Sequence, residues 1–160
     1  METAILNKPT LKTMKWKLFL LGLFKIPIVG YIKPRLLHID DESISVQIKL
    51  RKRTKNHLNS MYFGALAVGA DIAGGLHAFY FSESLGEQIS FAFKGMNANF
   101  IKRAESHIIF KSSEGKLIQE AVFNSQKTKK RVNQNVKVEA INSSNEIIAE
   151  FIMIVSVKVI

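Results

Sequence analysis

Asp71 is the residue whose surroundings most suggest chemistry, because it is the only formally charged residue between Met61 and Phe81. A carboxylate in such an apolar stretch is costly unless it is paired, hydrogen-bonded or protonated. An acid held in these surroundings can act as a general base or as a nucleophile. The structural alternative is that Asp71 lies near the surface, or caps a neighbouring loop through backbone N–H groups.

The apolar stretch around Asp71 predicts one long buried helix. It begins near Asn59 or Ser60, either of which can cap free N–H groups, and runs to about Phe81. Small residues crowd it, and these let a sheet or a second helix approach its backbone closely. We therefore expect a central helix wrapped by the strands that follow, with an N-terminus able to hold a developing oxyanion.

The segment 56–73 resembles the signature of hotdog-fold acyl-CoA thioesterases of the phenylacetyl-CoA and 4-hydroxybenzoyl-CoA kind. Asn56 and His57 match the loop of that signature, Gly64 matches its second glycine, and Ala-Asp-Ile-Ala at 70–73 matches its A-D-x-A. Tyr62 and Phe63 stand where those enzymes have His and Gly. This variant, N-H-x-x-S-M-Y-F-G-A-L, resembles a thioesterase-like branch of the superfamily.

The resemblance implies an α+β hotdog fold in which Asp71 is the catalytic acid and a backbone N–H near Gly64 polarises the thioester carbonyl. Asn56 or His57 would orient water or substrate, and Tyr62 would replace the missing His as a donor or fill the pocket. The substrate would be an acyl-CoA, with no separate cofactor. Two alternatives stay open: a non-catalytic protein that binds an acyl chain or lipid, and a hotdog dehydratase that pairs His57 with Asp71.

The net charge of +10 favours anionic partners, among them the phosphates of coenzyme A. Two groups of cations are candidates for holding that part of the substrate: Lys102 and Arg103 at a strand end, and Lys129, Lys130 and Arg131 in a basic turn. A solvated turn is the alternative for the second group. Nucleic acid is not expected, because the glycine of segment 94–100 is not followed by stacking aromatic residues.

The first 35 residues are expected to form a leader and a helix outside the main domain, which spans residues 36–160. Residues 12–25 combine a basic start with an apolar run that is too short to span a bilayer and lacks a clean cleavage site. This segment either packs on the edge of the domain as an amphipathic helix or lies on an anionic membrane surface. We expect a cytoplasmic protein, either free or peripheral to a membrane.

Alternating apolar residues predict strands at residues 36–39, 44–51, 88–100, 107–110, 131–141 and 146–159, with a short helix at 113–125 and a bulge at Gly95. The last strand is apolar enough to be buried on both faces. The absence of cysteine, and the lack of metal-ligand spacing among the four histidines, predict no metal site. Hotdog proteins generally pair, so the resemblance implies a homodimer or a dimer of dimers with sites at the subunit interface.

Overall fold

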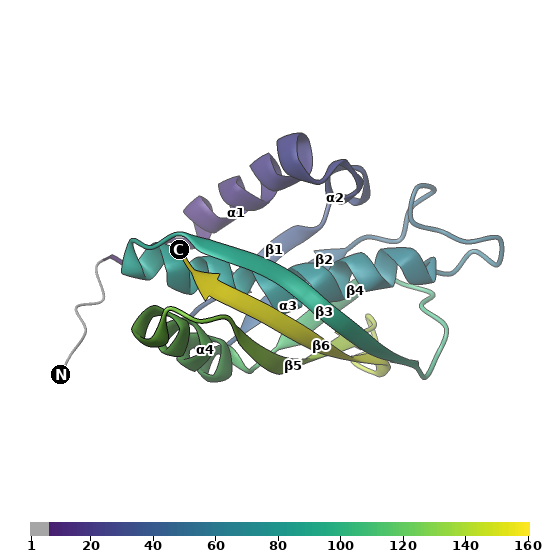
Figure 1. Cartoon of the computed structure of the whole chain (residues 1–160). Coiled ribbons are helices and arrows are strands. Elements are labelled where there is room, and N and C mark those ends of the chain that lie inside the picture. The colour runs from purple at the N-terminus through teal and green to yellow at the C-terminus, as the bar shows by residue number, and fades with distance from the viewer. Residues whose placement is uncertain (1–6) are drawn as a thin grey trace.

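The computed structural model describes residues 7–160 as an antiparallel sheet wrapped around one long helix, α3 (Phe63–Leu85) (Figure 1). The sheet contains β1 (Arg35–Ile39), β2 (Ile44–Ile48), β3 (Ile89–Phe100), β4 (Ile108–Ser112), β5 (Val132–Ile141) and β6 (Ile147–Val159), in the order β1-β2-β4-β5-β6-β3. The other helical elements are α1 (Leu11–Leu20), the π-helical turn η1 (Leu21–Lys25), α2 (Pro27–Ile32) and α4 (Gly115–Thr128). The predicted α+β hotdog architecture is confirmed.

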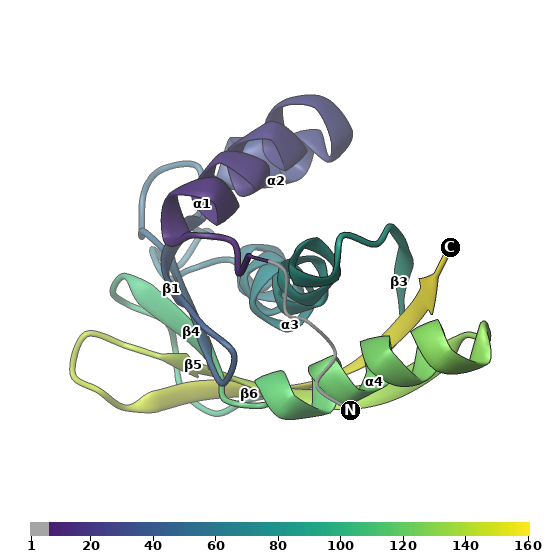
Figure 2. The same ribbon diagram turned by 90° about the vertical axis from the view of Figure 1, so that its left-hand side faces the viewer.

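Viewed end-on, the sheet curves around α3, with β1 and β3 at its two edges (Figure 2). β3 pairs with β6 along its whole length, and the register shifts between Phe93 and Gly95. The bulge predicted at Gly95 is therefore confirmed. The other side of β3 has no pairing strand among residues 7–160, which leaves a 12-residue edge open.

Glycines allow α3 to lie close to the sheet. A Cβ atom on Gly69 would lie 2.2 Å from the ring of Phe110, which is fully buried on β4. A Cβ on Gly75 would meet the ring of Phe91 at 3.0 Å. Close packing at these points offsets the helix propensity that each glycine forfeits.

The predicted start of the central helix is wrong. α3 begins at Phe63, because residues 54–62 form a loop closed by the Tyr62 amide, which donates to the Thr54 carbonyl at 2.8 Å, and by a β-bridge between Lys55 and Met61. Tyr62 takes the N-cap position with an extended backbone and no side-chain cap. At the other end the helix continues to Leu85 and stops at Gly86, whose φ of 65° suits glycine.

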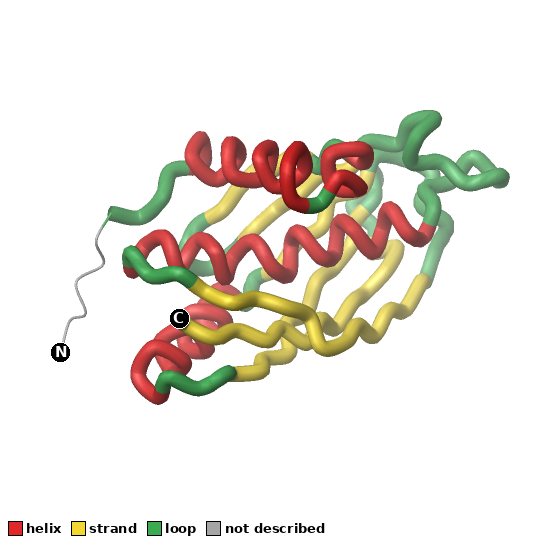
Figure 3. The backbone as a smooth tube through the Cα atoms, turned by 45° about the horizontal axis from the view of Figure 1, so that its top comes forward, coloured by secondary structure: helices red, strands yellow, loops and turns green. Residues whose placement is uncertain are grey.

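An N-terminal hairpin, formed by α1, η1 and α2, lies beside α3 on the side away from β5 and β6 (Figure 3). Met14, Leu18 and Val29 point inward and are buried. Trp16 and Phe24 point outward and are 59% and 72% exposed. The hairpin is thus apolar on both faces rather than amphipathic, and contact of residues 12–25 with a membrane surface stays a prediction.

The last strand departs in part from its prediction. β6 is buried on both faces at Ile148 and Ala149 and again from Val155 to Val157, whereas Ile147 and Ile152 are 36% and 37% exposed. The apolar run therefore covers more length than the core can enclose. α4 packs against α3, β5 and β6, and the Val159 amide donates to its Ser125 hydroxyl at 2.9 Å.

Candidate functional site

Asp71 lies in a cleft of about 410 Å³ between α3 and the edge strand β3. The cleft is lined by residues from three elements: Ala67, Val68 and Asp71 of α3, Phe93, Lys94, Gly95 and Met96 of β3, and Met153 of β6. The β3 residues belong to the bulge, which interrupts the regular ladder next to the carboxyl group. Asp71 thus projects from α3 towards the bulge in β3, where the pairing of β3 with β6 is irregular.

Burial raises the pKa of Asp71 from 3.8 to about 6. Among residues 7–160 its carboxyl group has neither a hydrogen-bond donor nor an ion pair, although Lys94 lines the same cleft. The loop-capping alternative therefore does not apply, while the surface alternative stays open, because Asp71 is half-buried in a cleft that opens to solvent. A carboxyl group with such a pKa can exchange protons near neutral pH, as a general base must.

The N-terminus of α3 carries the donors expected near Gly64. The Tyr62 carbonyl accepts from the amides of Ala65 and Leu66 at 2.9 and 3.1 Å, while the amides of Phe63 and Gly64 have no acceptor among the described residues. The ring of Tyr62 lies against Gly64, since a Cβ there would be 2.3 Å from a ring carbon. The ring therefore covers the α-carbon of Gly64, next to the free amide.

One chain does not bring Asp71 and the Gly64 amide to the same point. The two residues are seven positions apart on α3. They share a helix face, but seven residues of helix rise about 10 Å. A thioester carbonyl held by the Gly64 amide therefore lies too far from Asp71 of the same protomer for direct attack, which needs the reacting atoms about 3–3.5 Å apart.

Asn56 has a structural role in the loop before α3. Its side-chain oxygen accepts from the amides of Leu58 and Ser60 at 2.9 and 3.2 Å, and from the Ser60 hydroxyl at 3.2 Å. His57 is exposed and makes no side-chain contact among the described hydrogen bonds and ion pairs. The loop therefore holds Asn56 rigidly and presents His57 to solvent.

The two predicted groups of cations lie at opposite ends of β3. Lys102 follows the end of the strand and pairs with Glu146, and Arg103 approaches Glu105 at 3.9 Å. Arg131 donates to the hydroxyl of Ser90 at 2.8 Å, near the start of the strand, and Lys129 and Lys130 are exposed beside it. The two ends of a 12-residue strand are about 35 Å apart. One coenzyme A head group in one protomer cannot contact both groups.

The β3 side of the cleft was not among the residues predicted from the sequence. The predicted bulge at Gly95 was the available signal, because bulges concentrate next to functional sites. No sequence pattern indicated that exposed apolar side chains would gather around the start of α3 and the end of β3: Tyr62, Phe63, Phe100 and Ile101, which are 48–60% exposed. Edge-to-face packing of the Phe63 and Phe100 rings, with centroids 6.4 Å apart, joins the two elements.

A family model described as "Domain of unknown function (DUF4442)" matches residues 15–157. The chain belongs to this family. Among curated proteins none matches the DUF4442 chain. No helix within residues 7–160 is both long and apolar enough to cross a membrane, and the same residues hold no group of three His, Asp or Glu side chains placed to bind a metal ion.

Solved structures similar to the DUF4442 chain share its fold at low sequence identity. A protein of unknown function from Chlorobaculum tepidum superposes with a TM-score of 0.82 at 12% identity, covering 94% of this chain and 98% of its own. A protein from Shewanella oneidensis described as a candidate thioesterase superposes with a TM-score of 0.76 at 12% identity, covering 92% of this chain and 99% of its own. A thioesterase from Haemophilus influenzae superposes with a TM-score of 0.68 at 13% identity, covering 97% of this chain and 94% of its own. These likenesses show the hotdog fold that thioesterases use.

Proposed function

We propose that this DUF4442 chain hydrolyses acyl-CoA thioesters as a homodimer, with Asp71 as general base or nucleophile. The observation that most supports the proposal is the Asp71 carboxyl group, which lies unpaired in a cleft with its pKa raised to about 6. Thioesterases among the structural neighbours share the fold that presents it. Hydrolysis of a panel of acyl-CoA substrates identifies the acyl group that the cleft accepts.

As a base, Asp71 takes a proton from water while the water oxygen bonds to the thioester carbon. The C–S bond then breaks, and coenzyme A leaves as a thiolate that takes up a proton. As a nucleophile, the carboxylate bonds to the same carbon and expels the thiolate, and water then cleaves the resulting anhydride. In either case free N–H groups at the start of α3 stabilise the negative charge on the carbonyl oxygen.

A dimer would bring Asp71 of one protomer close to the Gly64 amide of the other. The open edge of β3 can pair with a second copy, since long uncovered edges readily accept another strand. Antiparallel pairing would set the Lys102 end of one protomer beside the Arg131 end of its partner, so the two groups of cations would join. It would also let Gly64 of one protomer and Asp71 of its partner act on one substrate.

The test is hydrolysis of an acyl-CoA panel from acetyl to palmitoyl, with aromatic acyl groups included, followed by the release of free thiol. Asp71→Asn should lower kcat/KM by about 10²–10⁴ while leaving the fold and the oligomeric state unchanged. The matched control is Glu83→Gln, which removes a carboxylate from the same helix, where Glu83 pairs with Lys17. Equal activity of Asp71→Asn and the native protein would contradict the proposed role of Asp71.

The second candidate function is an acyl-binding protein without hydrolysis. The position of Tyr62 favours it, because the ring lies over Gly64 where a substrate carbonyl must approach. In that case no acyl-CoA turns over, but at least one of them binds, and Asp71→Asn leaves its affinity unchanged. Tyr62→Ala opens the approach to Gly64 and would restore no activity in a protein that only binds.

A further inference from the structure

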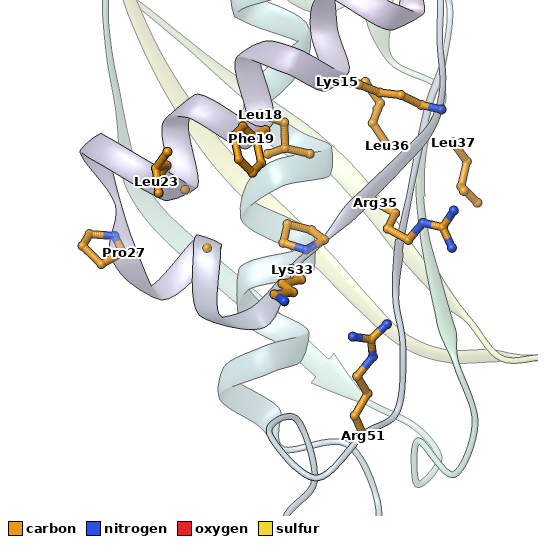
Figure 4. A pocket seen from close by; sticks show the side chains of 13 residues that line it. Lys15, Leu18, Phe19, Leu23, Pro27, Lys33, Arg35, Leu36, Leu37 and Arg51 are labelled. Atoms are coloured by element: carbon orange, nitrogen blue, oxygen red, sulfur yellow. The ribbon is translucent and has the colours of Figure 1, made fainter.

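A second cavity, of about 740 Å³, lies between the N-terminal hairpin and β1 (Figure 4). It shares no lining residue with the Asp71 cleft. Its volume falls within the range of about 300–1,000 Å³ that is usual for small-molecule sites. Its ligand therefore need not be the thioester that Asp71 is proposed to hydrolyse.

The lining of this cavity divides into an apolar part and a cationic part. Leucines and Phe19 supply the apolar side chains, from the hairpin and from β1. Four cations also line it: Lys15, Lys33, Arg35 and Arg51. Figure 4 shows the Arg35 and Arg51 side chains at one side of the cavity, opposite Leu23 and Pro27. This division matches a ligand with one apolar and one charged end.

Nothing within the described residues neutralises those four cations. No Asp or Glu lines the cavity, and none of the four side chains forms an ion pair or a hydrogen bond within residues 7–160. The surrounding sequence adds to the imbalance, since residues 7–39 contain seven Lys and Arg and no Asp or Glu. Four like charges gathered around one hollow raise the local concentration of anions there.

Specific contacts hold the hairpin over the cavity. The Arg53 guanidinium donates to the Tyr31 carbonyl at 3.0 Å and lies over the Tyr31 ring, 5.0 Å from its centroid. The backbones of Gly22 and Gly30 touch, because a Cβ on Gly30 would lie 2.4 Å from the Gly22 oxygen. The cavity is thus formed before any ligand enters, which lowers the cost of binding.

We propose that this cavity binds a single-chain amphiphile with an anionic head group, that is, one acyl chain that ends in a carboxylate or a phosphate. The chain lies against Leu18, Phe19 and Leu36, and the head group contacts Arg35 and Arg51. Arginine suits this role because its planar guanidinium can donate two hydrogen bonds to either anion. A neutral head group leaves the four cations uncompensated and binds more weakly.

The test is isothermal titration calorimetry with three amphiphiles of equal chain length, each kept below its micelle-forming concentration: a fatty acid, a lysophosphatidic acid and a monoacylglycerol. The native protein should bind one acid per chain at least tenfold more tightly than the monoacylglycerol. The tighter of the two acids identifies the head group. Arg35→Glu with Arg51→Glu should weaken that binding at least tenfold, and both positions are exposed, so the fold should persist.

The matched control is Lys116→Glu with Lys158→Glu, which makes the same charge change at exposed positions on α4 and β6. It should bind the acid within twofold of the native protein. Equal loss in both double variants would show a general charge effect and overturn the site. Equal affinity for the monoacylglycerol, or binding only to anionic vesicles and not to the monomeric acid, would overturn it as well.

Discussion

Burial of the Asp71 carboxyl group raises its pKa, which suits a general base, and also lowers the stability of the folded protein when the group is ionised. Its cleft gives the carboxyl group no donor within residues 7–160, so ionisation is opposed by burial without compensation. The same burial moves its pKa to where a base is most useful. Activity and stability should therefore respond to pH in linked but opposite ways.

The activity of the native protein should depend on the ionised form of Asp71. A base must be deprotonated to accept a proton, so kcat/KM should fall about tenfold per pH unit below about pH 6 and level off above it. The measurement is kcat/KM for the best acyl-CoA between pH 4.5 and 8, in buffers of constant ionic strength. A flat profile across this range would show that another group, or no titrating group, controls the reaction.

Stability should change in the opposite direction. The folded-state pKa of about 6 exceeds the ordinary 3.8, so the favourable contribution is present below pH 3.8 and is lost as the pH rises through 6. Asp71→Asn should consequently raise the free energy of unfolding by about 1–2 kcal/mol at pH 8 and by about a third of that at pH 4.5, where the carboxyl group is ionised in the unfolded chain but not in the folded one. Urea denaturation at the two pH values measures this difference.

The control for that comparison is again Glu83→Gln, whose carboxylate pairs with Lys17 at the surface. Surface pairs contribute at most about 1 kcal/mol, and here no gain should appear at pH 8. If Asp71→Asn were less stable than the native protein at pH 8, the carboxylate would have to possess a partner in solution. A second protomer could then be supplying that partner.

At the level of elements, the sequence predicted most of the fold because apolar periodicity is local. All six strands and the helix at Gly115–Thr128 occur within a few residues of their predicted positions. The start of α3 was missed because Asn59 and Ser60 are good caps by type, whereas the chain uses Asn59 in a turn with φ of 60°. Bonds within the loop, from Tyr62 to Thr54, and to a distant segment, from Met61 to Ala104, decided the boundary, and they leave no signal in the local residue types.

The candidate site was predictable only in part, for a similar reason. Asp71 stood out as a charge within an apolar run, which is a local signal. The lining from β3, the use of Asn56 inside its loop and the separation of Lys102 from Arg131 all depend on how distant segments meet. The cavity under the hairpin combines residues from 15 to 51 and carries no motif of its own.

Close packing between α3 and β4 predicts unequal effects for two glycines of the same helix. Gly69→Ala places a methyl group 2.2 Å from the ring of Phe110, which is rigid and fully buried, so the variant should lose about 1–3 kcal/mol of stability. Gly74→Ala meets the side chain of Met153 at 3.1 Å, and methionine adapts readily. Because alanine also has the better helix propensity, Gly74→Ala should leave the free energy of unfolding unchanged or raise it by up to about 1 kcal/mol.

Thermal and urea denaturation of the two variants test this pair directly. Both substitutions add one methyl group to α3, so helix propensity cancels in the comparison. Similar stabilities would mean that the Phe110 ring can move, and that the core around Gly69 is looser than its burial indicates.

At the level of the whole molecule, both the edge of β3 and the apolar cluster beside it are open to a second copy. The 12-residue edge carries a single charged residue, Lys94, and no proline, and its one bulge lies near the middle of the strand. Phe63 and Phe100, at one end of this edge, are 60% and 48% exposed. These features belong together if β3 of one protomer pairs with β3 of another.

Sedimentation equilibrium should then give a mass of twice 18.0 kDa, or a multiple of that dimer. Phe100→Glu combined with Ile101→Glu places charges in the apolar cluster without touching the lining of the Asp71 cleft, and should shift the protein to monomers, because an unpaired charge is costly in a buried interface. Ile28→Glu is the control, since Ile28 is 59% exposed on the hairpin, at least as exposed as Phe100 at 48% and Ile101 at 50%.

The outcome also bears on catalysis, because one protomer separates Asp71 from the Gly64 amide by about two helical turns. A monomeric double variant that stays folded should lose acyl-CoA hydrolysis together with its partner, although Asp71 itself is unchanged. Ile28→Glu should keep both the dimer and the activity. A native protein that is monomeric and fully active would require Asp71 to act without the Gly64 amide, and the composite site would then be wrong.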